Sequence, residues 1–325
     1  SMKIDTVSIF ILKLHALIEL GDVKKLEAEF ESRPPLGSSS RYYSAFLQAR
    51  GKFLKLKHKY EEAKAVFELT LSIHQAHQDS LEMATALLEM AKVEMDLGHY
   101  DSAALHIDKS KGIYLHTGYE LGVANAKSAL GEMYAELGQI DLSVDNYYSA
   151  LKIYEKLGAR KDLAVTSHEL AWMYFDQDID EALELLTRAL ELGRQMNNQL
   201  IEATVYNYLG VLYYEKGDYD NSLLAYKKSL WLFEKLQLQR QLATVEFNMG
   251  GLYEAKGNQL GAGINEYAIG HMYSLTDQYE KAREFLFKAK NRLESIEAKT
   301  DLVNCLEYIA IYYERINQTK EALKY

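Results

Sequence analysis

One short pattern recurs along this chain at a nearly constant interval, and this recurrence limits the possible folds more than any other feature. A small residue precedes an aromatic residue by three positions, and a turn residue follows a few positions later. The small and aromatic pairs are Gly131 and Tyr134, Ala171 and Tyr174, Gly210 and Tyr213, and Gly250 and Tyr253, with turns at Gly138, Asp178, Gly217 and Gly257. The turns are 40, 39 and 40 residues apart, and His58 and Gly98 continue the series toward the N-terminus. Such a period indicates a tandem array of similar units.

Each unit reads as two antiparallel helices. After the turn an aromatic or aliphatic residue precedes a small one, as in Tyr60/Ala63, Tyr100/Ala103, Ile140/Ser143 and Tyr219/Ser222, and apolar residues at helical spacing follow. The small residue allows the two helices to approach closely, the aromatic residue fills the gap to the next layer, and glycine supplies the left-handed conformation that ends the first helix. Because one pair cannot bury both of its apolar faces, neighbouring pairs must stack.

These positions resemble the tetratricopeptide repeat pattern over nearly the whole chain. The match is to a long variety, with about 40 residues per unit instead of 34, similar to the arrays of cell-polarity adaptors, kinesin light chains and bacterial peptide-sensing regulators. Two features depart from the pattern: Trp172 and Trp231 do not stand at the usual first-helix tryptophan position, and the repeat-ending proline is absent. The resemblance implies an all-α, right-handed superhelical solenoid of antiparallel helix pairs, whose first helices line a concave face.

We predict a single solenoid over residues 1–325. Its parts are a weak N-terminal unit at 3–33, a loop at 34–40, repeats over 41–257, a break in the period near 258–263, and repeats over 264–325 with a truncated last unit. The break is inferred because the turns after Gly257 are Asp277 and Asn317, at intervals of 20 and 40 residues. One second helix is therefore expected to be missing at this point.

Composition and motifs narrow the functional class. The net charge of −10 argues against a nucleic-acid partner, which would require a basic surface. A single cysteine, Cys305, excludes an internal disulfide framework and favours a reducing, cytoplasmic location. The most apolar N-terminal run, 7–20, contains charged residues and is too short to span a membrane.

Catalytic and metal-binding signals are weak. We find no phosphate-binding loop, nucleophile elbow or zinc-protease motif. His74 and His77 lie one helical turn apart but have no evident third ligand. We therefore expect a non-enzymatic protein with no cofactor and no metal site.

Function is expected at positions of the first helices that packing does not dictate. Counting from the small residue of each unit, the predicted protein- or peptide-binding groove consists of His168, Trp172, Phe175, Asn207, Val211, Tyr214 and Phe247. Large aromatic residues at such positions favour an amphipathic or extended peptide, although packing against the neighbouring first helix would also explain them. The recurring tyrosines at 134, 174, 213, 253, 273 and 313 are interpreted as packing residues.

The equivalent positions nearer the N-terminus form a basic rim, which consists of Gln48, Lys52, Lys55 and Lys92. Gln48, Lys52 and Lys55 lie in the stretch 41–60, which contains no acidic residue. This rim could capture carboxylates of a partner, and a solvated helix end would have the same composition.

The leading hypothesis is a scaffold that binds a protein or peptide segment, with acidic groups where it meets the basic rim. The alternative is a sensor or regulatory module of a larger signalling or transcription-regulating protein, since Ser1 before Met2 and the short last helix suggest a fragment. A third possibility is self-association through end helices, in which Val7, Phe10, Ile11 and Leu14 would form a cap or a dimer contact.

Overall fold

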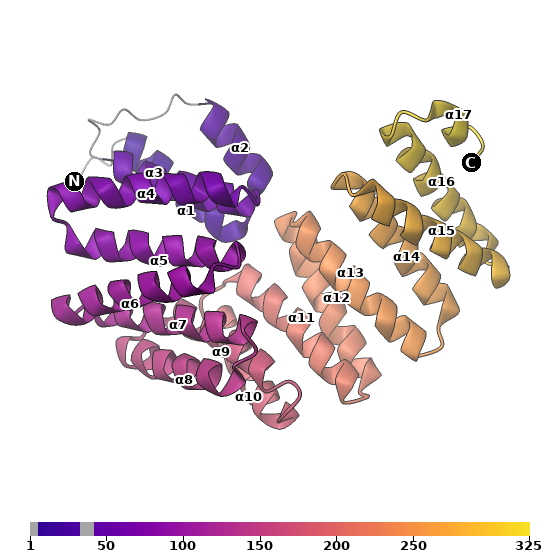
Figure 1. The fold of residues 1–325 in the computed structure, drawn as a ribbon. Helices are drawn as coiled ribbons and strands as arrows, with labels where there is room; N and C mark the ends of the chain where they lie inside the picture. Colours follow the sequence, from indigo (N-terminus) through magenta and orange to yellow (C-terminus); the bar gives the residue numbers. More distant parts are fainter. Residues whose placement is uncertain (1–5, 33–41) are drawn as a thin grey trace. The chain divides into compact units, whose positions relative to one another are not determined.

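The computed structural model describes residues 6–32 and 42–325, which form α-helices joined by short turns (Figure 1). The predicted loop at 34–40 lies outside the described residues. The chain divides into two compact units, unit 1 at residues 1–174 and unit 2 at residues 175–325. Within each unit, consecutive helices run antiparallel and lie side by side (Figure 1). The predicted all-α architecture of helix pairs is confirmed, whereas the continuity of one solenoid over 1–325 stays a prediction.

Unit 1 begins with two short helices and continues with regular pairs. Its helices are α1 (Thr6–Leu20), α2 (Val23–Ser32), α3 (Tyr43–Leu56), α4 (Tyr60–His77), α5 (Ser80–Asp96), α6 (Tyr100–Thr117), α7 (Glu120–Glu136), α8 (Ile140–Leu157) and α9 (Arg160–Met173). Unit 2 contains α10 (Ile179–Gln195), α11 (Gln199–Glu215), α12 (Tyr219–Leu236), α13 (Gln239–Ala255), α14 (Gln259–Leu275), α15 (Tyr279–Ser295), α16 (Lys299–Arg315) and α17 (Thr319–Ala322). No helix in the described ranges is both long and apolar enough to cross a membrane.

The predicted turns end the first helices through a left-handed residue. Gly138, Gly217 and Gly257 have φ values of 69°, 75° and 65°, a region that glycine enters without steric cost. The turn at Asp178 is different, because this residue is extended and its side chain accepts hydrogen bonds from the backbone N–H groups of Asp180 and Glu181. Asp178 therefore caps the start of α10 instead of ending α9.

The first helix of unit 1 closes that end of the core. Phe10, Ile11 and Leu14 are buried against α2 and α3, together with Phe46 and Phe53. Ile9, Leu12 and Leu20 are large apolar side chains of α1 that are exposed. The described residues thus give Phe10, Ile11 and Leu14 the role of a cap, and a dimer contact through them would require this core to open.

The break in the period falls between α13 and α14. Helix α14 follows α13 after a turn at 256–258, and α14 packs on α13 as well as on α15. One face of α14, which includes Asn265, meets α13, and another face, which includes Gly270, meets Leu286 of α15. Helix α14 is thus the second helix of the pair that α13 begins and the first helix of the pair that α15 completes.

Candidate functional site

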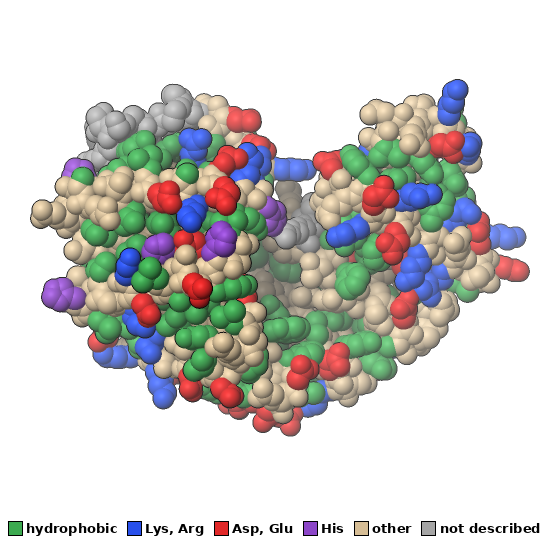
Figure 2. All heavy atoms as spheres, viewed as in Figure 1, with side chains coloured by type: hydrophobic (Ala, Val, Ile, Leu, Met, Phe, Trp, Pro, Cys, Tyr) green, Lys and Arg blue, Asp and Glu red, His purple; other side chains and the backbone are tan. Residues whose placement is uncertain are grey.

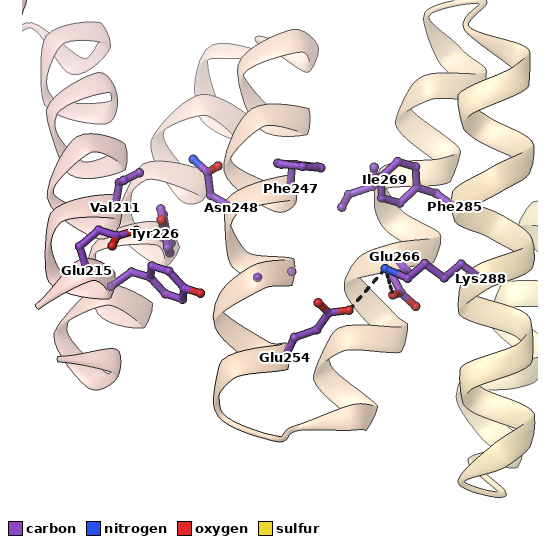
Figure 3. Close-up of a pocket in the computed structure, with 13 residues that line it drawn as sticks. Val211, Glu215, Tyr226, Phe247, Asn248, Glu254, Glu266, Ile269, Phe285 and Lys288 are labelled. Atoms are coloured by element: carbon purple, nitrogen blue, oxygen red, sulfur yellow. Dashed lines mark hydrogen bonds and ion pairs between the residues drawn. The ribbon is translucent and has the colours of Figure 1, made fainter. Parts of the chain in front are cut away.

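Unit 2 contains a pocket of about 360 Å³ at this break, formed by α11, α13, α14 and α15 with one side chain from α12 (Figure 3). Val211 and Glu215 reach it from α11, and Phe285 and Lys288 reach it from α15 (Figure 3). Tyr214 and Phe247 also line it. Three of the seven predicted groove residues, Val211, Tyr214 and Phe247, therefore meet at one pocket.

The pocket exists because a large side chain is missing from its expected place. In other pairs, the residue sixteen positions after the small residue covers it. A Cβ atom placed on Gly51, Gly131 or Gly210 would lie 2.6, 2.7 or 2.4 Å from the ring of Phe67, Tyr147 or Tyr226, respectively. The equivalent residue for Gly250 is Glu266, and the nearest heavy atom to a Cβ on Gly250 is Oδ1 of Asn265 at 3.7 Å.

Gly251 widens the same space. A Cβ atom on Gly251 would meet no heavy atom within 4 Å among the described residues. In α11, the equivalent position one residue after the small residue carries Val211. The backbone of α13 is therefore exposed to the pocket at two successive residues.

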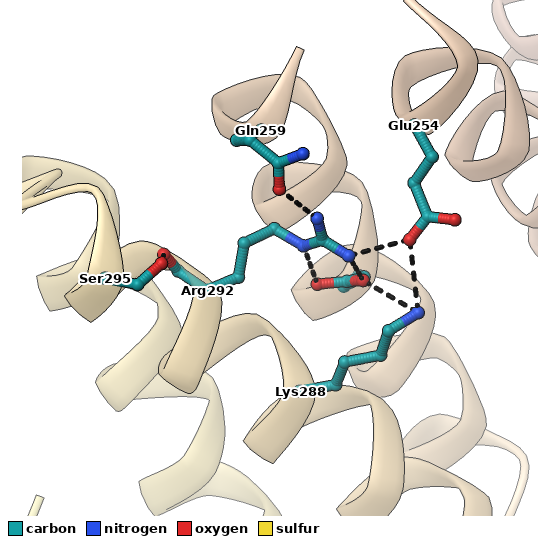
Figure 4. Close-up of polar contacts among 6 residues, drawn as sticks. Glu254, Gln259, Lys288, Arg292 and Ser295 are labelled. Carbon is teal, nitrogen blue, oxygen red and sulfur yellow. Dashed lines mark hydrogen bonds and ion pairs between the residues drawn. The ribbon is translucent and has the colours of Figure 1, made fainter. Parts of the chain in front are cut away.

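Glu266 points instead into an ion-pair network with α15 (Figure 4). Its side chain is 4% exposed and accepts two hydrogen bonds from Arg292, from Nε at 3.0 Å and from Nη2 at 2.8 Å. Lys288 Nζ lies 3.0 Å from Glu266 Oε1. Glu254 bridges the same two cations from the rim, at 2.7 Å from Arg292 Nη2 and 3.4 Å from Lys288 Nζ.

This network is electrically balanced and well hydrogen-bonded. The hydrogen bond to Glu266 is the main cause that raises the pKa of Lys288 and of Arg292, so both cations stay charged. Bidentate pairing is the geometry in which a buried carboxylate is best compensated. On the face of unit 2 drawn in Figure 2, acidic and basic side chains also stand next to one another.

Apolar side chains of α13, α14 and α15 line the pocket next to this network. Phe247 is 56% exposed, and its ring lies 6.3 Å from the ring of Phe285 in a T-shaped arrangement. Ile269 lies between α13 and α15 in the same view (Figure 3). The exposed ring of Phe247 thus adds apolar surface at the edge of the pocket.

The predicted amide, Asn207, lies next to the pocket and is already engaged. Its Oδ1 accepts a hydrogen bond of 3.0 Å from Nδ2 of Asn248, which lines the pocket. The two amides thus connect α11 to α13. The pair retains Nδ2 of Asn207 and Oδ1 of Asn248 for further hydrogen bonds.

A titratable group lies on α13 near the contact with α14. Asn265 Nδ2 donates to the backbone carbonyl of Glu246 at 2.6 Å and to its Oε2 at 2.7 Å. Burial, followed by the negative charge of Glu234, raises the pKa of Glu246 to about 7. This carboxyl group therefore titrates close to neutral pH.

The remaining predicted groove residues lie elsewhere. Phe175 is half-buried at the start of unit 2. His168 and Trp172 belong to α9 of unit 1, where His168 is 8% exposed with its Nε2 3.1 Å from Glu169 Oε1, and Trp172 is 45% exposed. These three residues do not line the pocket beside Gly251.

The basic rim is paired with acids in unit 1. Lys52 lies 3.0 Å from Glu89, and Lys55 lies 2.9 Å from Asp96. Gln48 donates a hydrogen bond of 3.1 Å to Glu82. The rim is therefore a mixed-charge surface, and an acidic partner would have to displace these carboxylates.

The pKa shifts at the rim agree with this pairing. Burial opposes ionisation of Glu89, but the positive charges of Lys52 and Lys92 outweigh it and lower its pKa to about 2. The charge of Glu89 in turn is the main cause that raises the pKa of Lys92. The described residues contain no group of three or more His, Cys, Asp or Glu side chains that could hold a metal ion.

Ten of the residues that line the pocket were not among the predicted groove residues, and five of them shape it most: Gly251, Glu254, Glu266, Phe285 and Lys288. Gly251 and Glu254 stand one and four positions after Gly250, so the count that found Val211 and Tyr214 also reaches them. Neither residue is apolar and bulky, which is the property that marked the predicted groove positions. Phe285 and Lys288 depend on how α15 packs after the break.

Two segments of the chain match tetratricopeptide repeat models, residues 122–195 and residues 203–232. The stacked antiparallel helix pairs of each unit define an α-helical repeat protein. Together these findings identify residues 122–195 and 203–232 as tetratricopeptide repeats.

The chain is similar to the protein KINESIN LIGHT CHAIN-RELATED 1 of Arabidopsis thaliana, with 26% identity over 240 residues. The match covers 70% of this chain and 38% of the length of that protein. Among solved structures, a Rap protein complexed with competence and sporulation factor is similar to this chain, with a TM-score of 0.61 and 18% sequence identity. The superposition covers 98% of this chain and 94% of the Rap chain. NprR in complex with its cognate peptide NprX has a TM-score of 0.57 at 13% identity, with 75% and 73% covered.

Proposed function

We propose that this protein is a non-enzymatic scaffold, and that unit 2 binds a peptide or a segment of a partner protein in the pocket beside Gly251. The observation that carries this proposal is the uncovered α13 backbone at Gly250 and Gly251 next to the exposed ring of Phe247. A side chain of the size of leucine or phenylalanine would fill this space. Burial of such a side chain contributes about 1.5–3 kcal/mol, which is enough to anchor a short segment.

Polar groups beside the pocket would orient the segment. The amides of Asn207 and Asn248 can bond a main-chain N–H or C=O of an extended peptide. The carboxylates of Glu215 and Glu254 at the rim favour a segment without acidic residues next to its anchor. The network around Glu266 keeps α14 and α15 in place and so preorganises the pocket.

The comparisons support this reading at the level of the fold. Two solved structures with this fold, the Rap protein and NprR, contain bound factors or peptides. Their partners belong to those proteins, and the ligand of this chain is inferred from its own pocket. The role of a sensor module within a longer signalling protein stays a prediction.

The test uses a phage library of random 12-residue peptides, selected on the whole chain and then titrated by fluorescence polarisation. A Cβ atom at Gly251 meets no described heavy atom within 4 Å and leucine suits a helix better than glycine, so Gly251→Leu is expected to occupy the pocket and stay folded. Selected peptides should contain a large apolar residue and bind Gly251→Leu at least about tenfold more weakly, a loss of roughly 1.4 kcal/mol.

The matched control is Gly112→Leu in unit 1, which also fills an open position on a helix and should leave this binding unchanged. Equal helicity by circular dichroism would show that both variants fold. The proposal is refuted if every selected peptide binds Gly251→Leu as tightly as the original chain.

A further inference from the structure

Unit 1 contains a different groove, of about 520 Å³, between α4, α5 and α6. Helices α4 and α6 are the second helices of their pairs, so the groove does not use the first-helix positions of the predicted binding face. Histidine and hydrophobic side chains stand side by side on the face of unit 1 drawn in Figure 2. The proposed function assigns no role to this surface.

The groove is apolar on two sides and basic on the third. Leu71 of α4, with Met83 and Leu87 of α5, provides the apolar walls. Helix α6 contributes His106, Lys109 and His116, whose spacing of three and seven residues places them on one face of the helix. None of the described residues that line the groove is an Asp or a Glu, although the chain has a net charge of −10.

His106 is held by a buried carboxylate. Its Nδ1–H donates to Oε2 of Glu94 at 2.7 Å, and Glu94 is 1% exposed. Lys64 lies 3.3 Å from the other oxygen of Glu94 and completes its neutralisation. The imidazole is therefore fixed in orientation at the groove wall, as expected of a recognition group.

Gly112 keeps the groove open. A Cβ atom there would meet no heavy atom within 4 Å among the described residues, so packing does not require glycine. Each of the second helices α4, α8, α10, α12 and α15 has a side chain at this position, twelve residues after its start: Ser72, Lys152, Glu191, Trp231 and Asn291, respectively. Glycine inside a helix lowers its stability relative to alanine. Its presence at the open groove is explained if a ligand side chain occupies the space.

We propose that this groove is a second binding site, which docks an acidic amphipathic segment of a partner protein. The segment would place a large apolar side chain over Gly112 and direct a carboxylate to Lys109. Within the described residues Lys109 makes no ion pair. The carboxylate of the segment could therefore pair with Lys109 without displacing another acidic group. His116 offers a further ring nitrogen on the same side of the segment.

The test separates this site from the pocket of unit 2. The random 12-residue library is selected on Gly251→Leu, in which that pocket is filled, and the best labelled peptide is titrated against further variants of the chain. We expect peptides rich in Asp, Glu and large apolar residues. Binding should weaken at least about tenfold in Gly112→Leu and about fivefold in Lys109→Glu, and should weaken further as salt is raised.

The control is the affinity for Gly251→Leu itself, which should equal that for the original chain. The proposal would be overturned if the selected peptides bound with the same affinity after Gly112→Leu. Selected peptides without acidic residues would also overturn it. A titration with sodium laurate tests a small amphiphile: tight laurate binding that Gly112→Leu abolishes, without any such peptide, would assign the groove to fatty acids instead. Either failure leaves the proposal for the pocket beside Gly251 intact.

Discussion

The pair α11–α12 and the pair α13–α14 begin with first helices that carry the same repeat pattern, but the two pairs pack in different ways. In the first pair, Tyr226 covers Gly210, and Ser222 and Ser229 of α12 donate hydrogen bonds of 2.7 Å to the carbonyls of Gly210 and Ala203. In the second pair the equivalent positions hold Glu266, Ala262 and Ile269. The interface between α13 and α14 has lost its aromatic cover and both serine contacts.

The difference follows from the two roles of α14. A second helix needs large residues toward its first helix, whereas a first helix needs small residues toward its own second helix. Gly263 and Gly270 of α14 satisfy the second demand, because Leu293 and Leu286 of α15 pack against them. Helix α14 thus fits α15 closely and fits α13 less closely, which leaves the pocket.

Polar contacts replace part of the lost packing. Asn265 bonds α14 to the backbone of α13, and Arg292 bonds α15 to Glu266. A break in the repeat period can therefore create a pocket between helices without any added loop. The α13–α14 pair should then depend for its stability on hydrogen bonds and ion pairs of charged groups. The α11–α12 pair should depend on the close packing of its side chains.

The largest effect is expected from removal of the arginine. Arg292→Ala deletes the bidentate partner of Glu266 and leaves this buried carboxylate with Lys288 alone. The loss of one partner of a buried pair costs about 3 kcal/mol in the free energy of unfolding. Urea unfolding would measure it, with Lys290→Ala as the control, because Lys290 pairs with the exposed Glu294 on the same helix. Similar midpoints for both variants would show that the network contributes little to the pair.

A smaller effect should distinguish the two glycines. Gly210→Ala places a Cβ 2.4 Å from the buried ring of Tyr226, and such overpacking is expected to lower the free energy of unfolding by about 2 kcal/mol. Gly250→Ala meets nothing closer than 3.7 Å and should raise it by about 0.5–1 kcal/mol, the gain in helix propensity. Thermal unfolding of both variants makes the comparison direct. Equal losses would mean that α13 and α14 pack as closely as α11 and α12.

The repeat made most of the fold predictable. The repeat pattern predicts helix ends at Gly138, Gly217 and Gly257, and all three have the left-handed conformation. The division after Tyr174 was not predicted, because Asp178 occupies the turn position in the sequence while α9 ends already at Met173. The repeat period of the sequence indicates which residues are equivalent, but it does not indicate how tightly successive helix pairs pack.

The site was predictable only in part. Val211, Tyr214 and Phe247 follow from counting within a unit, because the first helices repeat their geometry. Phe285 and Lys288 could not be found in this way, since they reach the pocket only through the packing of α15 on α14. The break in the period marked the correct region, but its consequence for side chains required coordinates.

A third expected effect is a pH dependence confined to the second pair. The folded pKa of Glu246 is about 7, above the ordinary value of 4.5. Between these values the folded protein binds more protons than the unfolded chain, so this group makes the protein less stable as pH rises from 4.5 to 7. The serine contacts of α11–α12 carry no such dependence. Hydrogen exchange of the α13 amides should therefore become faster relative to those of α11 over this range.

Glu246→Gln should remove the dependence while it keeps the acceptor for Asn265. The full shift corresponds to roughly 3 kcal/mol, and partial exposure of the group reduces the expected gain to about 1–2 kcal/mol at pH 8, with no gain near pH 4.5. Urea midpoints of the variant and the original chain at both pH values measure it. Glu234→Gln should give a smaller gain of the same sign, because Glu234 is the second cause of the raised pKa. A gain for Glu246→Gln that is equal at both pH values would show that the substitution improves packing and that Glu246 does not titrate in this range.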